Sequence, residues 1–244
     1  MSGIRIDYSD LSGMVDEGRK QSGQRKARRS RLIRFPWVML KWSVGLVILA
    51  VLPFAVLIRG GVFAYREWAL GTWPALALAV AVAVTTLLLA GYAWAFSRKV
   101  GAGKSVRWVL TRGAIAIAIA YSGYALVYVA SANVKSEDIQ AQYSAIHPLL
   151  RVAASSLILV DPSTVITDAG RSAEDYYAMG LPENEASLHF EQEDGFVHAL
   201  DLRTSGRPEW RNRAVEMAFW ALGFHSLRHV GTADHLHLSL RLPG

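Results

Sequence analysis

The sequence of 244 residues contains no cysteine. Disulfide bonds and thiolate metal sites are therefore excluded, so a bound metal ion must be held by histidine and carboxylate side chains. Acidic residues are also missing from the long apolar runs that lie between residues 35 and 131. Ion- and proton-coupled transporters carry ionisable groups at membrane depth, so this absence argues against a transporter.

Residues 1–34 have too few apolar side chains to build a core, and we expect them to be disordered. Most of the basic residues of this segment gather in residues 25–31. Such a cluster binds either nucleic acid or anionic lipid. Because an apolar run follows at once, we favour a cytoplasmic tail beside the membrane and predict no nucleic-acid partner.

Hydrophobic residues make up 52% of the chain and are concentrated in residues 35–131. Three apolar runs predict three transmembrane helices, at about 37–58, 68–96 and 113–130, joined by a short link at 59–67 and a basic hairpin at 98–107. Each run is long enough to cross about 30 Å of hydrocarbon.

Lysine and arginine are abundant in the tail and in the hairpin, whereas the link has only Arg59 and Arg66. Basic loops stay in the cytoplasm, so we expect the N-terminus inside and the C-terminal part outside. In a bacterium this places the protein in the inner (cytoplasmic) membrane with a periplasmic C-terminal domain.

Residues 132–146 are predicted to be a linker, and residues 147–244 have the composition and size of one small domain. The apolar spacing predicts helices at 148–159, 172–179 and 208–222 and strands at 165–167, 187–189, 196–203 and 235–241. Helices and short strands in this order indicate an α+β fold with a small antiparallel sheet.

Histidine and aspartate gather near the expected strands. Strict alternation places His235 and His237 on one face of the last strand, an unusual choice for a core. Asp201 and His189 can join His237 on the same side of the sheet. Two histidines and one carboxylate with an open fourth position are typical of catalytic zinc. His147, His198, His225 and His229 are interpreted as ordinary histidines.

A general base is needed beside such a zinc ion. Asp234 lies three residues before His237 and His235 lies two before it, so both are placed for this role. The residues alone leave the choice between them open.

Four segments, in this order, resemble a known family: Gly170-Arg171-Ser172, Ser187-x-His189, Ala199-x-Asp201-Leu202 and His235-x-His237. Together they resemble the D-Ala-D-Ala metallopeptidases and murein endopeptidases of the lysostaphin-type, hedgehog-like fold. The resemblance covers residues 145–241. It implies that His189, Asp201 and His237 are zinc ligands and that Arg171 contacts substrate near the scissile carbonyl.

The chain departs from the family in two places. His189 and Asp201 lie twelve positions apart instead of seven, which we interpret as a loop insertion at 191–195. Asp234 stands where carboxypeptidase members have a glutamate base, and His235 matches a histidine near the reaction centre of the endopeptidases.

The resemblance predicts a membrane-anchored, zinc-dependent peptidase that acts on D-amino-acid-containing stem peptides of peptidoglycan, as a carboxypeptidase or an endopeptidase. Zinc-activated water would attack the peptide carbonyl. The alternative is a catalytically inactive peptidoglycan-binding or scaffold module of the same fold, which the altered spacing and the aspartate in place of glutamate favour.

Overall fold

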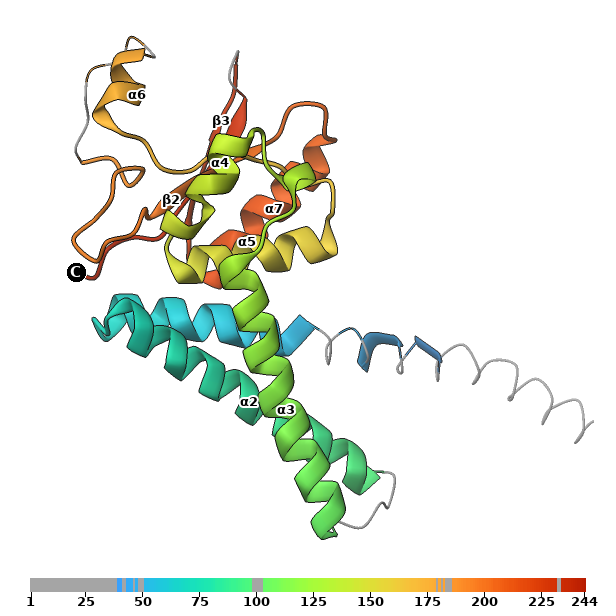
Figure 1. Ribbon diagram of the computed structural model, residues 1–244. Helices are drawn as coiled ribbons and strands as arrows, with labels where there is room; N and C mark the ends of the chain where they lie inside the picture. Colours follow the sequence, from blue (N-terminus) through green and yellow to red (C-terminus); the bar gives the residue numbers. More distant parts are fainter. Residues whose placement is uncertain are drawn as a thin grey trace, which may run out of the picture. The chain divides into compact units, whose positions relative to one another are not determined.

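The structure is a computed structural model that describes residues 39–40, 43–45, 47, 51–97, 103–178, 180, 182, 186–231 and 234–244 (Figure 1). The chain divides into two compact units, residues 1–50 and residues 51–244. The predicted basic tail and parts of the first predicted span lie outside the described residues. The account below concerns the second unit.

The second unit begins with a continuous helix over residues 51–67. The segment expected as a short link, residues 59–67, is therefore helical. Gly61 in this segment lies against the helix α5 (Pro148–Val160). A Cβ atom on Gly61 would lie 2.5 Å from Cδ2 of Leu149, so glycine allows the two helices to approach closely.

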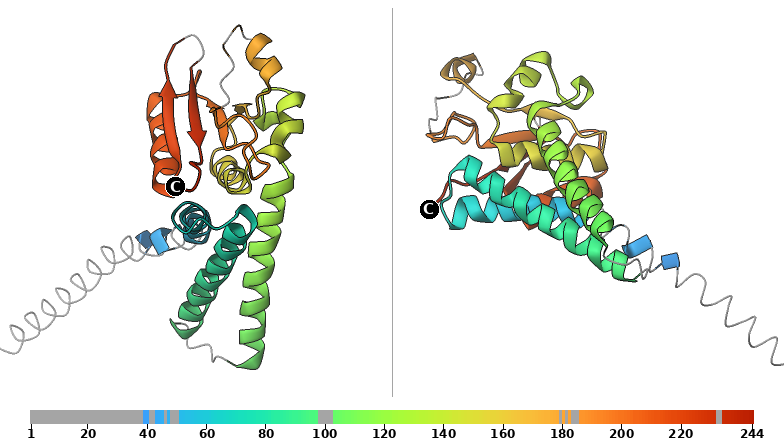
Figure 2. Two further views of the ribbon diagram at one scale, coloured as in Figure 1. Left: turned by 90° about the vertical axis from the view of Figure 1, so that its left-hand side faces the viewer. Right: turned by 60° about the horizontal axis from the view of Figure 1, so that its bottom comes forward.

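Two described helices, α2 (Thr72–Ser97) and α3 (Lys104–Val127), are long and apolar enough to cross a membrane. They pack against each other as a pair (Figures 1 and 2). The third span was predicted to begin at residue 113, but α3 begins nine residues earlier. Lysine and arginine are good helix formers, so Lys104 and Arg107 lie in its first turn instead of in a loop.

The segment expected as a linker, residues 132–146, is folded. It contains most of the 3₁₀ turn η1 (Ser131–Asn133), the helix α4 (Glu137–Gln142) and the turn η2 (Tyr143–Ala145). The buried Tyr143 hydroxyl donates to the carbonyl of Ala125 in α3, at 2.8 Å. Asn133 donates to the carbonyls of Pro162 and Thr164. The segment therefore packs α3 directly against the C-terminal domain.

The C-terminal domain contains one four-stranded antiparallel sheet, which confirms the predicted α+β class. Its order is β1-β2-β4-β3, with β1 at Ile166–Asp168, β2 at Ala199–Arg203, β3 at His225–His229 and β4 at His235–Ser239. The helices α6 (Ala173–Ala178) and α7 (Glu209–Leu222) complete the domain together with α5 (Figure 1).

Two strand assignments from the sequence need correction. Residues 187–189 were expected to be a strand but form a turn, because the amide of Phe190 donates to the carbonyl of Ser187. The strand β3 was not anticipated, since its sequence has a single aliphatic residue, Leu227, whose side chain is largely exposed.

The sheet separates an apolar face from a polar one. Leu200 and Leu202 of β2 and Leu236 and Leu238 of β4 are fully or almost fully buried in one core with residues of α5 and α7. Neighbouring side chains on a strand point to opposite faces. The residues between these leucines, including Asp201 and His237, therefore lie on the opposite face, where Asp201 is directly paired with His237.

Candidate metal centre

His189, Asp201 and His237 lie together on the polar side of the sheet, as the sequence predicted. Nδ1 of His237 lies 2.9 Å from Oδ1 of Asp201 and 3.2 Å from Nε2 of His189. Nε2 of His189 lies 3.4 Å from the same Oδ1. Three potential ligand atoms from three segments therefore form a compact triangle, which has the spacing to hold a metal ion.

The size of this triangle fits zinc. With bonds of about 2.0–2.1 Å and tetrahedral angles, two zinc ligands lie about 3.3 Å apart. The observed edges of 2.9, 3.2 and 3.4 Å are within a few tenths of that value. The side chains of His189 and Asp201 are 3% and 4% exposed, whereas that of His237 is 21% exposed. The group is thus accessible from the side of His237.

His189 is oriented by the backbone of the loop after β1. Its Nδ1 lies at hydrogen-bond distance from the carbonyl oxygen of Ala169. A carbonyl only accepts, so Nδ1 donates, and in the neutral ring the lone pair is on Nε2, which faces the other two ligands. The amide of Arg171 in turn donates to the carbonyl of His189 at 2.9 Å. Metal-ligating histidines almost always donate their other ring N–H in this way, and the contact of Nδ1 with Ala169 supplies that hydrogen bond here.

The two oxygens of Asp201 have different neighbours. Oδ1 faces both histidines, whereas Oδ2 lies 3.3 Å from Nη2 of Arg171 and 3.6 Å from Nε2 of His235. Burial alone would raise the pKa of Asp201, but its interactions with His189 and His237 outweigh burial and lower the pKa below its usual range. A carboxylate that is ionised at neutral pH is suited to bind a cation.

Arg171 connects Asp201 to a second carboxylate. Its guanidinium binds Asp168 at 2.7 Å through Nε and at 2.6 Å through Nη2. Asp168 lies at the end of β1 and pairs in register with Asp201. The sequence did not single out Asp168, although its position at the end of a strand next to Arg171 was a usable signal. In the structure Arg171 fixes the orientation of Asp201 through its hydrogen bond to Oδ2, on the side away from the two histidines.

Asp234 and His235 differ sharply in their surroundings. Both oxygens of Asp234 accept from Arg228, and Oδ1 also accepts from the hydroxyl of Thr204 at 2.6 Å. These hydrogen bonds lower the pKa of Asp234. His235 instead lies within 3.6 Å of Asp201, and its side chain is 25% exposed. Of the two candidate bases, His235 is the one beside the candidate metal ligands.

A histidine from the unanticipated strand β3 completes this region. The ring of His229 stacks on that of His235, with centroids 4.6 Å apart, and its centroid lies 6.4 Å from that of His237. Sequence reasoning took His229 as an ordinary histidine. Only the pairing of β3 with β4 brings it opposite His235.

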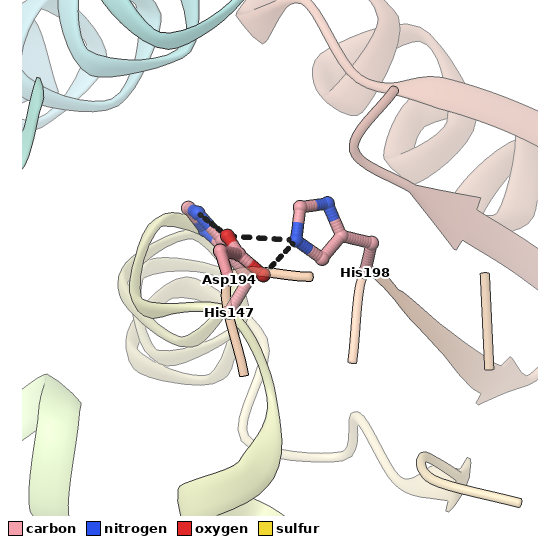
Figure 3. Close-up of side chains that lie close together, drawn as sticks. All are labelled: His147, Asp194 and His198. Carbon is pink, nitrogen blue, oxygen red and sulfur yellow. Dashed lines mark hydrogen bonds and ion pairs between the residues drawn. The ribbon is translucent and has the colours of Figure 1, made fainter. Parts of the chain in front are cut away.

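A second group with metal-ligand spacing consists of His147, Asp194 and His198 (Figure 3). The carboxylate of Asp194 lies beside both imidazole rings, which are fully buried and contact each other with centroids 4.7 Å apart. Nε2 of His198 lies 2.9 Å and 3.1 Å from the two oxygens of Asp194, and Nε2 of His147 lies 3.6 Å from Oδ2. The interpretation of both histidines as ordinary therefore missed their contacts with Asp194, which tertiary packing alone creates.

The described residues thus place five of the six predicted site residues in one region: the three proposed ligands, together with Arg171 and His235 next to Asp201. Asp234 is held by Arg228. Comparisons of the chain with protein-family models, with curated proteins and with solved structures find no match.

Proposed function

We propose that this chain is a zinc-dependent peptidase that is anchored in a membrane and acts on D-amino-acid-containing peptides of peptidoglycan. The observation that carries the proposal is the triangle of His189, Asp201 and His237, whose dimensions fit a zinc ion with an open coordination position. Thiolate-free ligand sets of this kind are typical of catalytic zinc, whereas structural zinc is usually enclosed by four protein ligands.

Zinc held by these three side chains would supply a Lewis acid that polarises a carbonyl and acidifies water. The chain's own residues would handle the proton and the orientation. His235 is placed to accept a proton at Nε2, because it lies beside Asp201 and remains partly exposed. Arg171 fixes Asp201 through Oδ2 and leaves Oδ1 directed at the two histidines.

The substrate class comes from the order of motifs that resembles the D-Ala-D-Ala metallopeptidases and murein endopeptidases. The membrane helices support it, since α2 and α3 are long and apolar enough to span a bilayer. With a further span at 37–58 and the N-terminus in the cytoplasm, the C-terminal domain would face the periplasm, where peptidoglycan lies. The stem peptides would then be the partner, with no role for nucleic acid.

The proposal is tested with the full chain purified in detergent. We expect one zinc ion per chain by elemental analysis and release of an amine or of D-alanine from purified muropeptides. His237→Ala should lose both properties, while His225→Ala, on the neighbouring strand β3, should keep both. Absence of bound zinc in the unaltered protein, or unchanged turnover in His237→Ala, would refute the proposal.

A second candidate function is peptidoglycan binding without catalysis. The engagement of both oxygens of Asp234 by Arg228 favours it, since Asp234 stands where the carboxypeptidases that the chain resembles have their base. This candidate predicts that the protein co-sediments with purified sacculi, while zinc-loaded protein releases neither an amine nor D-alanine.

A further inference from the structure

Asp194 is outside the candidate metal centre but lies in the same loop as His189. Its Oδ2 accepts a hydrogen bond of 2.7 Å from the hydroxyl of Thr72, the first residue of α2. The hydroxyl of Tyr65, near the end of the helix 51–67, donates to the same oxygen at 3.3 Å. These partners lie 122 and 129 positions away in the sequence, so Asp194 ties the loop to the ends of two helices.

The histidines around Asp194 are arranged as hydrogen-bond donors. Nδ1 of His147 accepts from the amide of Leu149 and so caps α5, which places the ring hydrogen on Nε2. That hydrogen faces the hydroxyl of Thr72 at 3.1 Å and the carboxylate. Burial, followed by the nearby His198, lowers the pKa of His147 to about 3, so the ring stays neutral.

His198 faces acceptors with both of its nitrogens. Nδ1 lies 3.2 Å from the carbonyl of Leu240, and Nε2 lies 2.9 Å from Asp194. Burial opposes ionisation of Asp194, but hydrogen bonds from Thr72 and His198 outweigh it and lower its pKa. The carboxylate is thus surrounded by donors. Nε2 of His147 has no free lone pair for a metal ion while the cap of α5 is intact.

Backbone hydrogen bonds lead from this cluster to the metal centre. The amide of His198 donates to the carbonyl of Leu188 at 2.9 Å, directly before His189. The preceding residue, Val197, is fixed to the start of α5, since it exchanges hydrogen bonds with Ala145 and His147. Displacement of Asp194 would therefore act on His189 through one short, continuous set of contacts.

We propose that Asp194 is a positioning residue through which the end of the helix 51–67 and the start of α2 fix the loop that carries His189. We call the group of Tyr65, Thr72, His147, Asp194 and His198 the Asp194 clasp. The proposal rests on the metal centre proposed above. It requires that loss of a contact on the helix side, far from the metal in sequence, weakens metal binding by the folded protein.

The test uses the full chain in lipid nanodiscs and compares Thr72→Val, which is nearly isosteric but lacks the donor, with Thr72→Ser, which restores it. Thr85→Val is the matched control, because the hydroxyl of Thr85 donates only to the carbonyl of Ala81 within α2. Zinc affinity is measured by competition with a chelator, well below the unfolding temperature. Residues that act on a binding site through a chain of contacts typically change its affinity by about 2- to 30-fold.

We expect Thr72→Val and Asp194→Asn to weaken zinc binding by about 2- to 30-fold, with Thr72→Ser and Thr85→Val within about twofold of the unaltered protein. Amide hydrogen exchange in residues 187–198 should rise in the same two variants. Unchanged affinity together with unchanged exchange would overturn the proposal. A second zinc equivalent that disappears in His147→Ala would also overturn it, because the clasp would then be a metal site.

The two proposals fail in different ways. If the unaltered chain binds no zinc, the proposed function fails, and the exchange of residues 187–198 alone decides whether the clasp orders the loop. If zinc binds and muropeptides are cleaved while Thr72→Val behaves like Thr85→Val in both measurements, the function stands and the clasp is refuted.

Discussion

Arg228 holds both carboxylate oxygens of Asp234, with Nε 2.7 Å from Oδ1 and Nη2 2.8 Å from Oδ2. The geometry is bidentate, the arrangement in which arginine binds a carboxylate most specifically. Asp234 lies directly before β4, and Arg228 belongs to β3, so the pair fastens the ends of two neighbouring strands. This relationship separates the two candidate bases.

We predict that His235→Gln lowers turnover of muropeptides by about 100-fold or more, the usual effect of removing a general base. Asp234→Asn should lower turnover by less than about tenfold, because both oxygens of this carboxylate accept hydrogen bonds from Arg228 and are not available to take a proton. The measurement is kcat and KM with a purified muropeptide at saturating zinc. A large loss of kcat in Asp234→Asn, with His235→Gln close to normal, would reverse the assignment.

Arg171 should influence binding of the proposed zinc ion through its contact with Asp201. Arg171→Ala leaves Asp168 and Asp201 without their shared cation. We expect zinc affinity to fall by about 10- to 100-fold, the usual loss when a group that hydrogen-bonds to a metal ligand is removed. Arg171→Lys should restore little, because an ammonium group cannot reproduce the planar fork that faces two carboxylates. Chelator competition measures the affinity. Equal zinc affinity in Arg171→Ala and the unaltered protein would contradict this role.

A pH-dependent contribution to stability is expected from Asp161, whose carboxylate pairs with Arg207 and Arg211 and accepts from Ser163. Burial raises the pKa of Asp161, but Ser163 and the two arginines more than compensate, so the net pKa is lowered. The stabilisation is therefore full above the unfolded pKa of about 3.9 and disappears as the pH falls through the folded pKa.

Asp161→Asn should accordingly reduce the free energy of unfolding by about 1.5–3 kcal/mol at pH 7, the usual value of hydrogen bonds to charged groups. The difference from the unaltered protein should shrink below about pH 4. Denaturant unfolding in detergent at several pH values measures it, with the exposed Asp138→Asn in α4 as the control. A difference that grows on acidification would contradict the sign of the pKa shift.

Gly223 ends α7 in the left-handed conformation, with φ of 98°. A Cβ atom there would also lie 2.6 Å from Nη1 of Arg59 and 2.9 Å from Cγ1 of Val62 in the helix 51–67. Gly206 has a similar φ of 76° with no atom within 4 Å of the added Cβ. Gly206→Ala should therefore cost about 1–2 kcal/mol through backbone strain alone.

Gly223→Ala should cost more than Gly206→Ala, since it adds a collision with the helix 51–67 to the same strain. The comparison of the two variants by thermal unfolding isolates the contact between α7 and that helix. Equal losses would mean that the helix 51–67 moves away from α7 at little cost.

Much of the fold could be predicted from local patterns. Pro148 and Gly223 mark the start of α5 and the end of α7, and strict alternation identified β4. The sheet strand β3 could not be found in this way, because an edge strand with an exposed leucine has no alternation to detect. The start of α3 before the predicted span could not be found either, since basic residues occur both in loops and in first helical turns.

The sequence by itself determined which side chains share a face wherever the backbone is periodic, so Asp201 and the pair His235 and His237 were placed correctly. Only the tertiary structure decided the rest. His189 joins the metal centre from a turn, where no period relates neighbouring side chains, and Asp234 is bound by Arg228. Asp194 meets Thr72 because packing joins segments that are far apart in the chain, and such contacts leave no local pattern to read.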